Sequence, residues 1–208
     1  MILIESLMTA GFEPAIYGMR NPHESWHKSD SHEDKIGDAD KKLALDLIAG
    51  GSVHCKFRRQ IVTWASITAP LYWWKQLDTY RIGVEKDSCS TMHTIHKREL
   101  NINDFSVDQM HKDGVNDIDH LVKRINHMRW KYLVEKNPFE KKALWYTIIQ
   151  LLPDSYNQKR TVMLSYEAMA NMYEWRRNHK LDEWKEFCEW IESLPHSWII
   201  TGNREAIK

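Results

Sequence analysis

The stretch ITAPLYWWKQLDTYRIGVEKDSCSTMH, residues 67–93, decides how this chain is organised. It begins with a proline and an aromatic cluster at residues 70–74, and Gln76, Tyr80 and Arg81 follow closely. After Gly83 it ends in serine and threonine hydroxyls. Aromatic walls, an amide, a guanidinium and hydroxyls are the parts of a pocket for a planar, anionic ligand such as a nucleotide. The alternative is a helix whose tryptophans belong to the core and whose charged residues face solvent.

Composition and charge indicate one globular domain over residues 1–208. The chain is 42% hydrophobic and 28% charged, and its 29 basic Lys and Arg side chains balance 29 acidic ones. Zero net charge makes nucleic acid an unattractive partner, because proteins held by phosphates carry a basic surplus. The three cysteines (Cys55, Cys89 and Cys188) form no CxxC pair, which favours a reduced, cytoplasmic setting. No run approaches the ~20 apolar residues of a membrane span.

A polar, turn-rich stretch at residues 20–40 predicts a surface loop that covers a site. It contains His23, His27 and His32, but their spacing does not place two imidazoles on one face of an element. We therefore expect no metal site there.

Hydrophobic periodicity predicts an α-rich α+β fold with a small, mainly antiparallel sheet flanked by helices. Asp40 is the expected N-cap of the first long helix, which Gly50 and Gly51 end. Pro70 suits the first turn of the helix that carries Gln76. The expected helices cover 41–49, 71–80, 117–136, 140–152, 161–180 and 181–193; strands are expected at 61–64 and 197–201, a turn at 154–160, and a strand or short helix at 1–8.

Two motifs together resemble the flavin-dependent thymidylate synthases (ThyX). That family carries a Gln, two residues, an Arg-His-Arg signature and a serine loop, and this chain has Gln76, then 79–81 (Thr-Tyr-Arg), then Ser88 and Ser90. In the family's C-terminal region, Leu-Pro precedes a Thr-initiated helix with an Asn five residues before an essential Arg. Here Asn171 and Arg176 keep that interval after a Leu-Pro at 152–153. The resemblance covers roughly residues 50–190.

The resemblance implies a homotetramer that binds FAD and dUMP and methylates dUMP to dTMP, with methylenetetrahydrofolate as carbon donor and NADPH as reductant. Arg176 would be the catalytic residue, supplying a cation near the pyrimidine. The implied substrate-binding residues are Gln76, Arg81, Ser88, Ser90 and Arg176; the implied cofactor-binding residues are Thr79, Tyr80, Arg81 and Asn171.

The chain also departs from the family. Thr79 and Tyr80 replace the first Arg and the His of the signature, and Ser165 and Glu167 replace an Asn and an Arg early in the C-terminal helix. Residues that could compensate for the lost cations are Arg58, Arg59, Arg124 and Arg160.

Three functions stay open from the sequence. The first is a ThyX-like enzyme, divergent in the way of bacteriophage members, acting in the host cytoplasm on dUMP or a related pyrimidine nucleotide. The second is a catalytically inactive nucleotide-binding or oligomeric phage protein. The third is a helical nucleic-acid-binding protein that uses Arg58, Arg59 and the basic face at 123–131, which the zero net charge disfavours.

Overall fold

The computed structural model describes residues 2–32 and 35–202. The chain forms two compact units. Unit 1 comprises residues 1–3, 68–79 and 87–160, and unit 2 comprises residues 4–67, 80–86 and 161–208. Within the described residues, no helix has the length and apolar character that a bilayer span requires.

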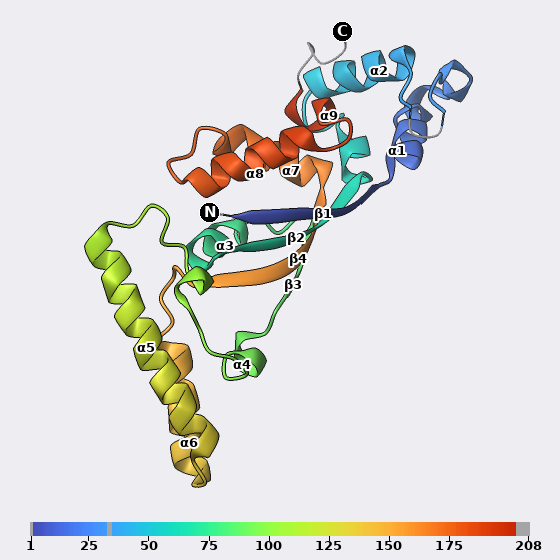
Figure 1. The fold of residues 1–208 in the computed structure, drawn as a ribbon. Coiled ribbons are helices and arrows are strands. Elements are labelled where there is room, and N and C mark those ends of the chain that lie inside the picture. Colours follow the sequence, from blue (N-terminus) through green and yellow to red (C-terminus); the bar gives the residue numbers. More distant parts are fainter. Residues whose placement is uncertain (1, 33–34, 203–208) are drawn as a thin grey trace. The chain divides into compact units, whose positions relative to one another are not determined.

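One four-stranded antiparallel sheet runs through the fold, in the order β1-β2-β4-β3 (Figure 1). Together with the helices, it confirms the α+β class that the sequence predicted. The expected strand at 61–64 is confirmed and extends to Pro70, because alternate side chains of β2 (Ala65, Ile67 and Ala69) are fully buried. The strands are β1 (Leu3–Ala10), β2 (Val62–Pro70), β3 (Val84–Ser88) and β4 (Asn157–Ser165).

Strand β4 corrects the predicted turn at 154–160 and the predicted start of the next helix at Thr161. Val162 and Leu164 are both fully buried, which is the period of a strand and not of a helix. The helix begins only after Ser165, whose side chain accepts a hydrogen bond from the backbone N of Ala168 at 3.2 Å. A β-branched segment that pairs with neighbouring strands overrides the helical spacing.

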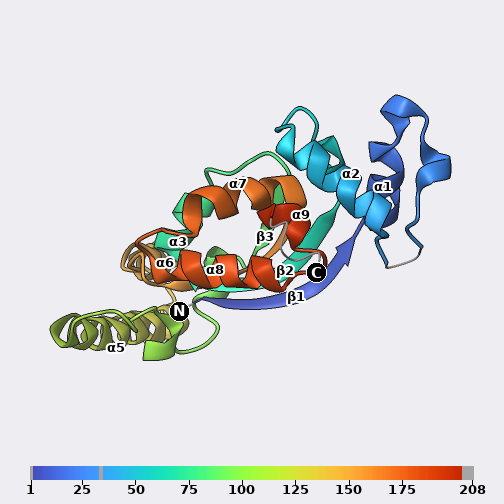
Figure 2. The same ribbon diagram turned by 90° about the horizontal axis from the view of Figure 1, so that it is seen from above.

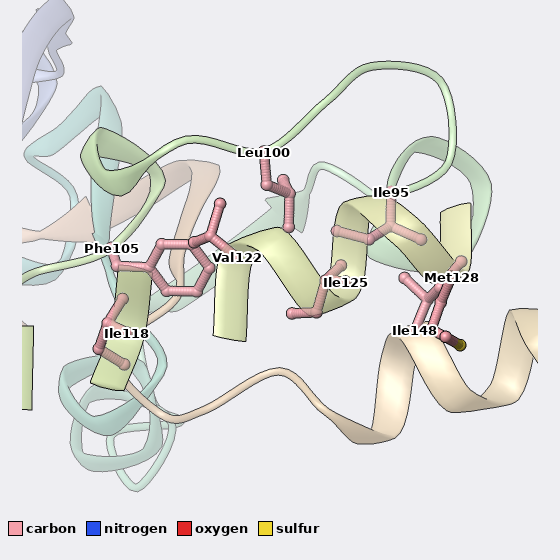
Figure 3. Close-up of a cluster of buried hydrophobic side chains, with 8 residues drawn as sticks. All are labelled: Ile95, Leu100, Phe105, Ile118, Val122, Ile125, Met128 and Ile148. Atoms are coloured by element: carbon pink, nitrogen blue, oxygen red, sulfur yellow. The ribbon is translucent and has the colours of Figure 1, made fainter. Parts of the chain in front are cut away.

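Unit 1 is built around the helix pair α5 and α6, which lie side by side (Figure 1). Helix α5 begins at Lys112, earlier than expected, because the imidazole of His111 caps it through the N–H of Asp113 at 3.4 Å. A cluster of buried side chains packs between α5, α6 and the preceding loop (Figure 3): Ile95, Leu100, Phe105, Ile118, Val122, Ile125, Met128 and Ile148. The helices of this unit are α3 (Leu71–Leu77), α4 (Thr91–Thr94), η4 (Ile102–Asp104), α5 (Lys112–Val134) and α6 (Pro138–Gln150).

Unit 2 holds α7 against α8 and α9; α7 and α8 lie next to each other (Figure 2). The expected helix at 181–193 is confirmed as α8, and its apolar side chains at helical spacing are all buried: Trp184, Phe187, Cys188 and Ile191. The helices of this unit are α1 (Phe12–Met19), η1 (Asn21–His23), η2 (Trp26–Lys28), α2 (Asp38–Ala49), η3 (Lys56–Arg59), α7 (Tyr166–Arg176), α8 (Asp182–Ser193) and α9 (Trp198–Thr201).

Two expectations in unit 2 are wrong. The segment 197–201 holds the helix α9 (Trp198–Thr201) and not a strand, because its buried apolar residues pack against α7. Asp40 does not cap α2, which starts at Asp38 after Gly37. Its carboxylate is fully buried and pairs with Nε of Arg20 at 2.6 Å.

Candidate functional site

The predicted site residues fall into both units. Residues in unit 1 are Gln76, Thr79, Ser88 and Ser90, and residues in unit 2 are Tyr80, Arg81, Asn171 and Arg176.

Helix α3 positions Gln76 and Thr79. Its Trp73 and Trp74 are fully buried, so these tryptophans belong to the core and do not form the wall of a pocket. The helix ends at Leu77, and the hydroxyl of Thr79 donates to the backbone O of Gln76 at 2.7 Å. Thr79 thus closes the end of α3, where one of the last carbonyls of a helix needs a partner.

Behind α3, Arg160 of β4 takes part in a compact ion-pair network. Its guanidinium lies 4.3 Å from the ring centre of Trp74, and Nη1 lies 3.0 Å from Oδ1 of Asp78. Its Nε donates to Oε1 of Gln158 at 3.0 Å. Arg160 was one candidate for a compensating cation, but here its charge is matched by the carboxylate of Asp78.

The serine loop is fixed by its backbone. The N–H of Cys89 donates to the O of Lys159 at 2.9 Å, and the side-chain amide of Gln158 donates to the O of Cys89 at 3.1 Å. Ser88 ends β3 and is exposed, and Ser90 precedes the short helix α4. The two hydroxyls therefore sit on an anchored loop at the surface of unit 1.

In unit 2, Arg176 is held by two aromatic side chains. Its Nε donates to the phenol oxygen of Tyr80 at 3.0 Å, and its guanidinium carbon lies 4.7 Å from the ring centre of Trp184. Trp184 is fully buried and also meets the Tyr80 ring edge to face at 6.2 Å. A guanidinium against one ring and hydrogen-bonded to another has a defined plane, and the contact with a buried ring stabilises it.

His179 lies beside this group and adds a titratable side chain. Its ring centre is 6.3 Å from that of Trp184. Partial burial, with the positive charges of Arg176 and Lys180 nearby, lowers the pKa of His179 below its ordinary value. The surroundings of Arg176 therefore disfavour a second cation.

Arg81 stands at the turn that follows. Gly83 has a φ of +70°, and a side chain there would meet Oγ of Ser165 at 2.3 Å, so the turn requires glycine. Arg81 itself is exposed. The sequence prediction for Arg81 as a binding residue stays a prediction.

Asn171 lines a cavity of about 310 Å³ within unit 2. The walls of this cavity come from α2, η3, α7, α9 and the residues that adjoin them. Its polar walls include Arg58, Glu167 and Arg177. Arg58 is only 9% exposed, and burial lowers the pKa of its guanidinium. The volume lies at the lower end of the roughly 300–1,000 Å³ range of small-molecule sites.

Sequence reasoning missed two members of these groups. Trp184 belongs to the predicted helix at 181–193, and nothing in its spacing indicates that it would contact Arg176. Glu167 is a departure from the family motif. Its partner Arg58 lies 109 residues earlier in the chain, so the sequence alone does not indicate that the two residues pair. Arg58 is one of the four arginines named as possible compensating cations, and the fold places it in the lining of the Asn171 cavity.

Comparison with known proteins assigns the fold. Thymidylate Synthase X (ThyX) from Helicobacter pylori, solved with FAD and dUMP, matches with a TM-score of 0.73 and 15% identity over 96% of both chains. Another structure of the flavin-dependent thymidylate synthase ThyX from the same organism, complexed with FAD and dUMP, gives a TM-score of 0.69 and 16% identity over 95% of this chain and 97% of that one. The chain has the ThyX fold. By sequence, no protein-family model matches it, and no curated protein is significantly similar.

The described part of this ThyX-fold chain contains no group of three or more His, Cys, Asp or Glu side chains that could hold a metal ion. His32 forms an isolated bridge with Lys35 in the 20–40 stretch. That stretch is not a featureless loop, because it holds two short helices and the buried pair of Arg20 and Asp40.

Proposed function

We propose that this chain is a flavin-dependent enzyme of the thymidylate synthase type that acts on dUMP or a related pyrimidine nucleotide. The reaction would convert dUMP to dTMP, with the one-carbon unit from methylenetetrahydrofolate and the electrons from NADPH. The observation that carries the proposal is the orientation of Arg176 by Tyr80 and Trp184, in a chain whose fold matches ThyX over nearly its whole length.

Arg176 has the chemistry that the reaction needs. Methyl transfer to a pyrimidine builds negative charge on the ring, and a positioned guanidinium stabilises such charge in the transition state. The phenol oxygen of Tyr80 accepts a hydrogen bond from Nε–H of Arg176. This hydrogen bond would fix the plane of the guanidinium before the substrate binds. Gln76, Arg81 and the hydroxyls of the serine loop are proposed to bind the nucleotide and its phosphate.

The flavin would supply the transfer of reducing equivalents, and part of its binding is assigned to the Asn171 cavity. The donor set fits a polar heterocyclic ring, because the cavity offers the amide of Asn171, the guanidinium groups of Arg58 and Arg177 and the carboxylate of Glu167. Tyr80 and Arg81 would contact the cofactor from the turn after α3. Thr79 fits less well, since its hydroxyl already donates to Gln76. We further propose that the protein is a homotetramer. If it is encoded by a bacteriophage, it would act in the cytoplasm of the bacterial host.

A second function, a catalytically inactive nucleotide-binding phage protein, is favoured by one observation. Glu167 stands where the ThyX motif has an Arg, and it lies 3.9 Å from the guanidinium of Arg58. The carboxylate neutralises a cation that would otherwise face an anionic ligand.

The test is an absorption spectrum of the purified protein with and without added FAD, followed by size exclusion. We expect bound-flavin bands on a tetramer, and then dTMP formation from dUMP. Arg176→Lys keeps a positive charge but loses the planar guanidinium, so turnover should fall about 10²–10³-fold. The exposed Arg124→Lys is the matched control. A protein that stays colourless with FAD, or full turnover in Arg176→Lys, contradicts the proposal; flavin or nucleotide binding without turnover supports the inactive alternative.

A further inference from the structure

Two residues that line the Asn171 cavity each have a buried polar atom that lacks a hydrogen-bond partner among the described residues. These atoms are Nε of Arg58, a donor, and Oε2 of Glu167, an acceptor. Buried polar groups in folded proteins are nearly always paired, so two such atoms in residues that line one cavity call for an explanation.

The ion pair between these residues does not satisfy them. Nη1 of Arg58 and Oε2 of Glu167 are 3.9 Å apart, which is too long for a hydrogen bond. Nη2 of Arg58 donates to the backbone O of Ile200 at 3.4 Å. The guanidinium is therefore anchored at one end, while its Nε–H and Oε2 of Glu167 are left for a third group to pair with.

The chemistry of that third group follows from the two atoms. A simple anion would be attracted by Arg58 but repelled by Glu167. A simple cation would be attracted by Glu167 but repelled by Arg58. A neutral group that carries an acceptor next to a donor satisfies both atoms at once. Ile48, Ala170 and Ile200 supply apolar walls, which suit the flat faces of a ring.

We infer that the Asn171 cavity binds the lactam edge of a heterocycle, with its C=O accepting from Arg58 and its adjacent N–H donating to Glu167. The inference rests on the proposed function, because uracil, the isoalloxazine of flavins and the pterin of folates share this edge. The cavity volume of about 310 Å³ suits one such ring system and not a whole dinucleotide. Glu167 thereby becomes a binding residue and not merely a lost cation.

Methylation of the lactam nitrogen provides the probe, because it removes the proton that Glu167 would accept. Two ligand pairs are titrated by calorimetry: dUMP against N3-methyl-dUMP, and riboflavin against N3-methylriboflavin. In a third experiment, tetrahydrofolate is titrated into the protein. For the ring that occupies the cavity, the parent should bind about ten- to hundred-fold more tightly than its methylated form.

Glu167→Gln tests the residue directly, since the amide is nearly isosteric with the carboxylate but presents a neutral acceptor. In this variant the preference for the unmethylated ligand should shrink to about threefold or less. Glu189→Gln on the exposed face of α8 should leave the preference unchanged. Arg58→Lys should weaken binding of both members of the pair, and Arg59→Lys, an exposed neighbour, should not.

Each outcome separates this inference from the proposed function. If dTMP forms but Glu167→Gln leaves the discrimination intact, the inference is wrong and the proposed function stands. If Glu167→Gln removes the discrimination while no variant and not even the wild type forms dTMP, the inference stands and the proposed function fails. The inference is also wrong if dUMP and riboflavin each bind no more tightly than their methylated forms and tetrahydrofolate does not bind.

Discussion

Asp40→Asn is the substitution for which the structure gives the largest expected loss of stability. The carboxylate of Asp40 is fully buried and accepts hydrogen bonds from Nε of Arg20 at 2.6 Å, from Oγ of Ser29 at 2.7 Å and from Oγ of Ser31 at 2.6 Å. The side chain of Arg20 is only 5% exposed. An asparagine would leave the Arg20 charge buried without its counter-charge, and breaking such a pair costs about 3–5 kcal/mol.

Urea unfolding followed by circular dichroism measures this loss. With a slope of about 1–3 kcal/mol per molar urea, a loss of 3–5 kcal/mol lowers the unfolding midpoint by at least about 1 M. Asp38→Asn is the control, because it changes the same residue type in the same first turn of α2, where the side chain is 92% exposed. The control should change the free energy of unfolding by no more than about 0.5 kcal/mol. A loss below about 1 kcal/mol for Asp40→Asn would refute the reasoning that the pair is buried and coupled.

The same pair predicts how stability depends on pH. Burial of Asp40 by itself raises its pKa, but the hydrogen bonds from Ser31, Ser29 and Arg20 outweigh burial and hold the pKa below the ordinary value of 3.8. A carboxylate with a depressed pKa in the folded state contributes stability above its unfolded pKa, and loses it as the pH falls through the folded value. Acid titration of unfolding should therefore show a loss in the wild type that is smaller in Asp40→Asn; parallel curves would count against the assignment.

The remaining predictions concern the turn, the cap and the Arg176 group. Gly83→Ala should destabilise the protein by about 1–2 kcal/mol or more in thermal unfolding, because the glycine has a φ of +70° and a Cβ would lie 2.3 Å from Oγ of Ser165; an unchanged midpoint would contradict this. Ser165→Ala removes the N-cap of α7 and should cost about 1 kcal/mol in the same assay, whereas Ser165→Asn, another good cap, should cost less. Tyr80→Phe keeps the ring but removes the oxygen that accepts from Arg176, so dTMP formation should fall about tenfold with little change in fold stability; equal turnover would show that the hydrogen bond does not position the guanidinium.

The helices and strands that bury one regular face could be predicted from sequence. Helix α8 has apolar residues at helical spacing, and these residues are buried. Strand β2 is a run of β-branched and aromatic residues that leads to a proline. The failures occur where local pattern and tertiary pairing disagree. Thr161 and its neighbours fit both a helix and a strand, and only the neighbouring strands decide between them. In the same way, Trp175 fits the helical stripe but lies on the solvent side of α7, 73% exposed.

The candidate site was predictable only where motif spacing carried information. The interval from Asn171 to Arg176 identified two side chains of α7, and the structure places one in a cavity and the other against Tyr80. Spacing could not identify the aromatic partner Trp184, because it lies beyond the turn that ends α7. Nor could it assign the tryptophans of α3, whose burial depends on β4: Trp74 donates through Nε1 to the backbone O of Gln158 at 2.9 Å.

Two carboxylates in or beside the family motifs, Asp78 and Glu167, are each paired with an arginine inside the same unit. Asp78, between Gln76 and the signature position, pairs with Arg160 at 3.0 Å, and Glu167 faces Arg58 at 3.9 Å. The two pairs differ in what they leave for a ligand. Arg160 makes short hydrogen bonds to Asp78 and Gln158, so its donors are largely used within the protein. Among the described residues, Nε of Arg58 and Oε2 of Glu167 are both buried and have no hydrogen-bond partner. Of the two pairs, only the one at the Asn171 cavity leaves polar atoms for a ligand, so ligand discrimination there should depend on Arg58 and Glu167.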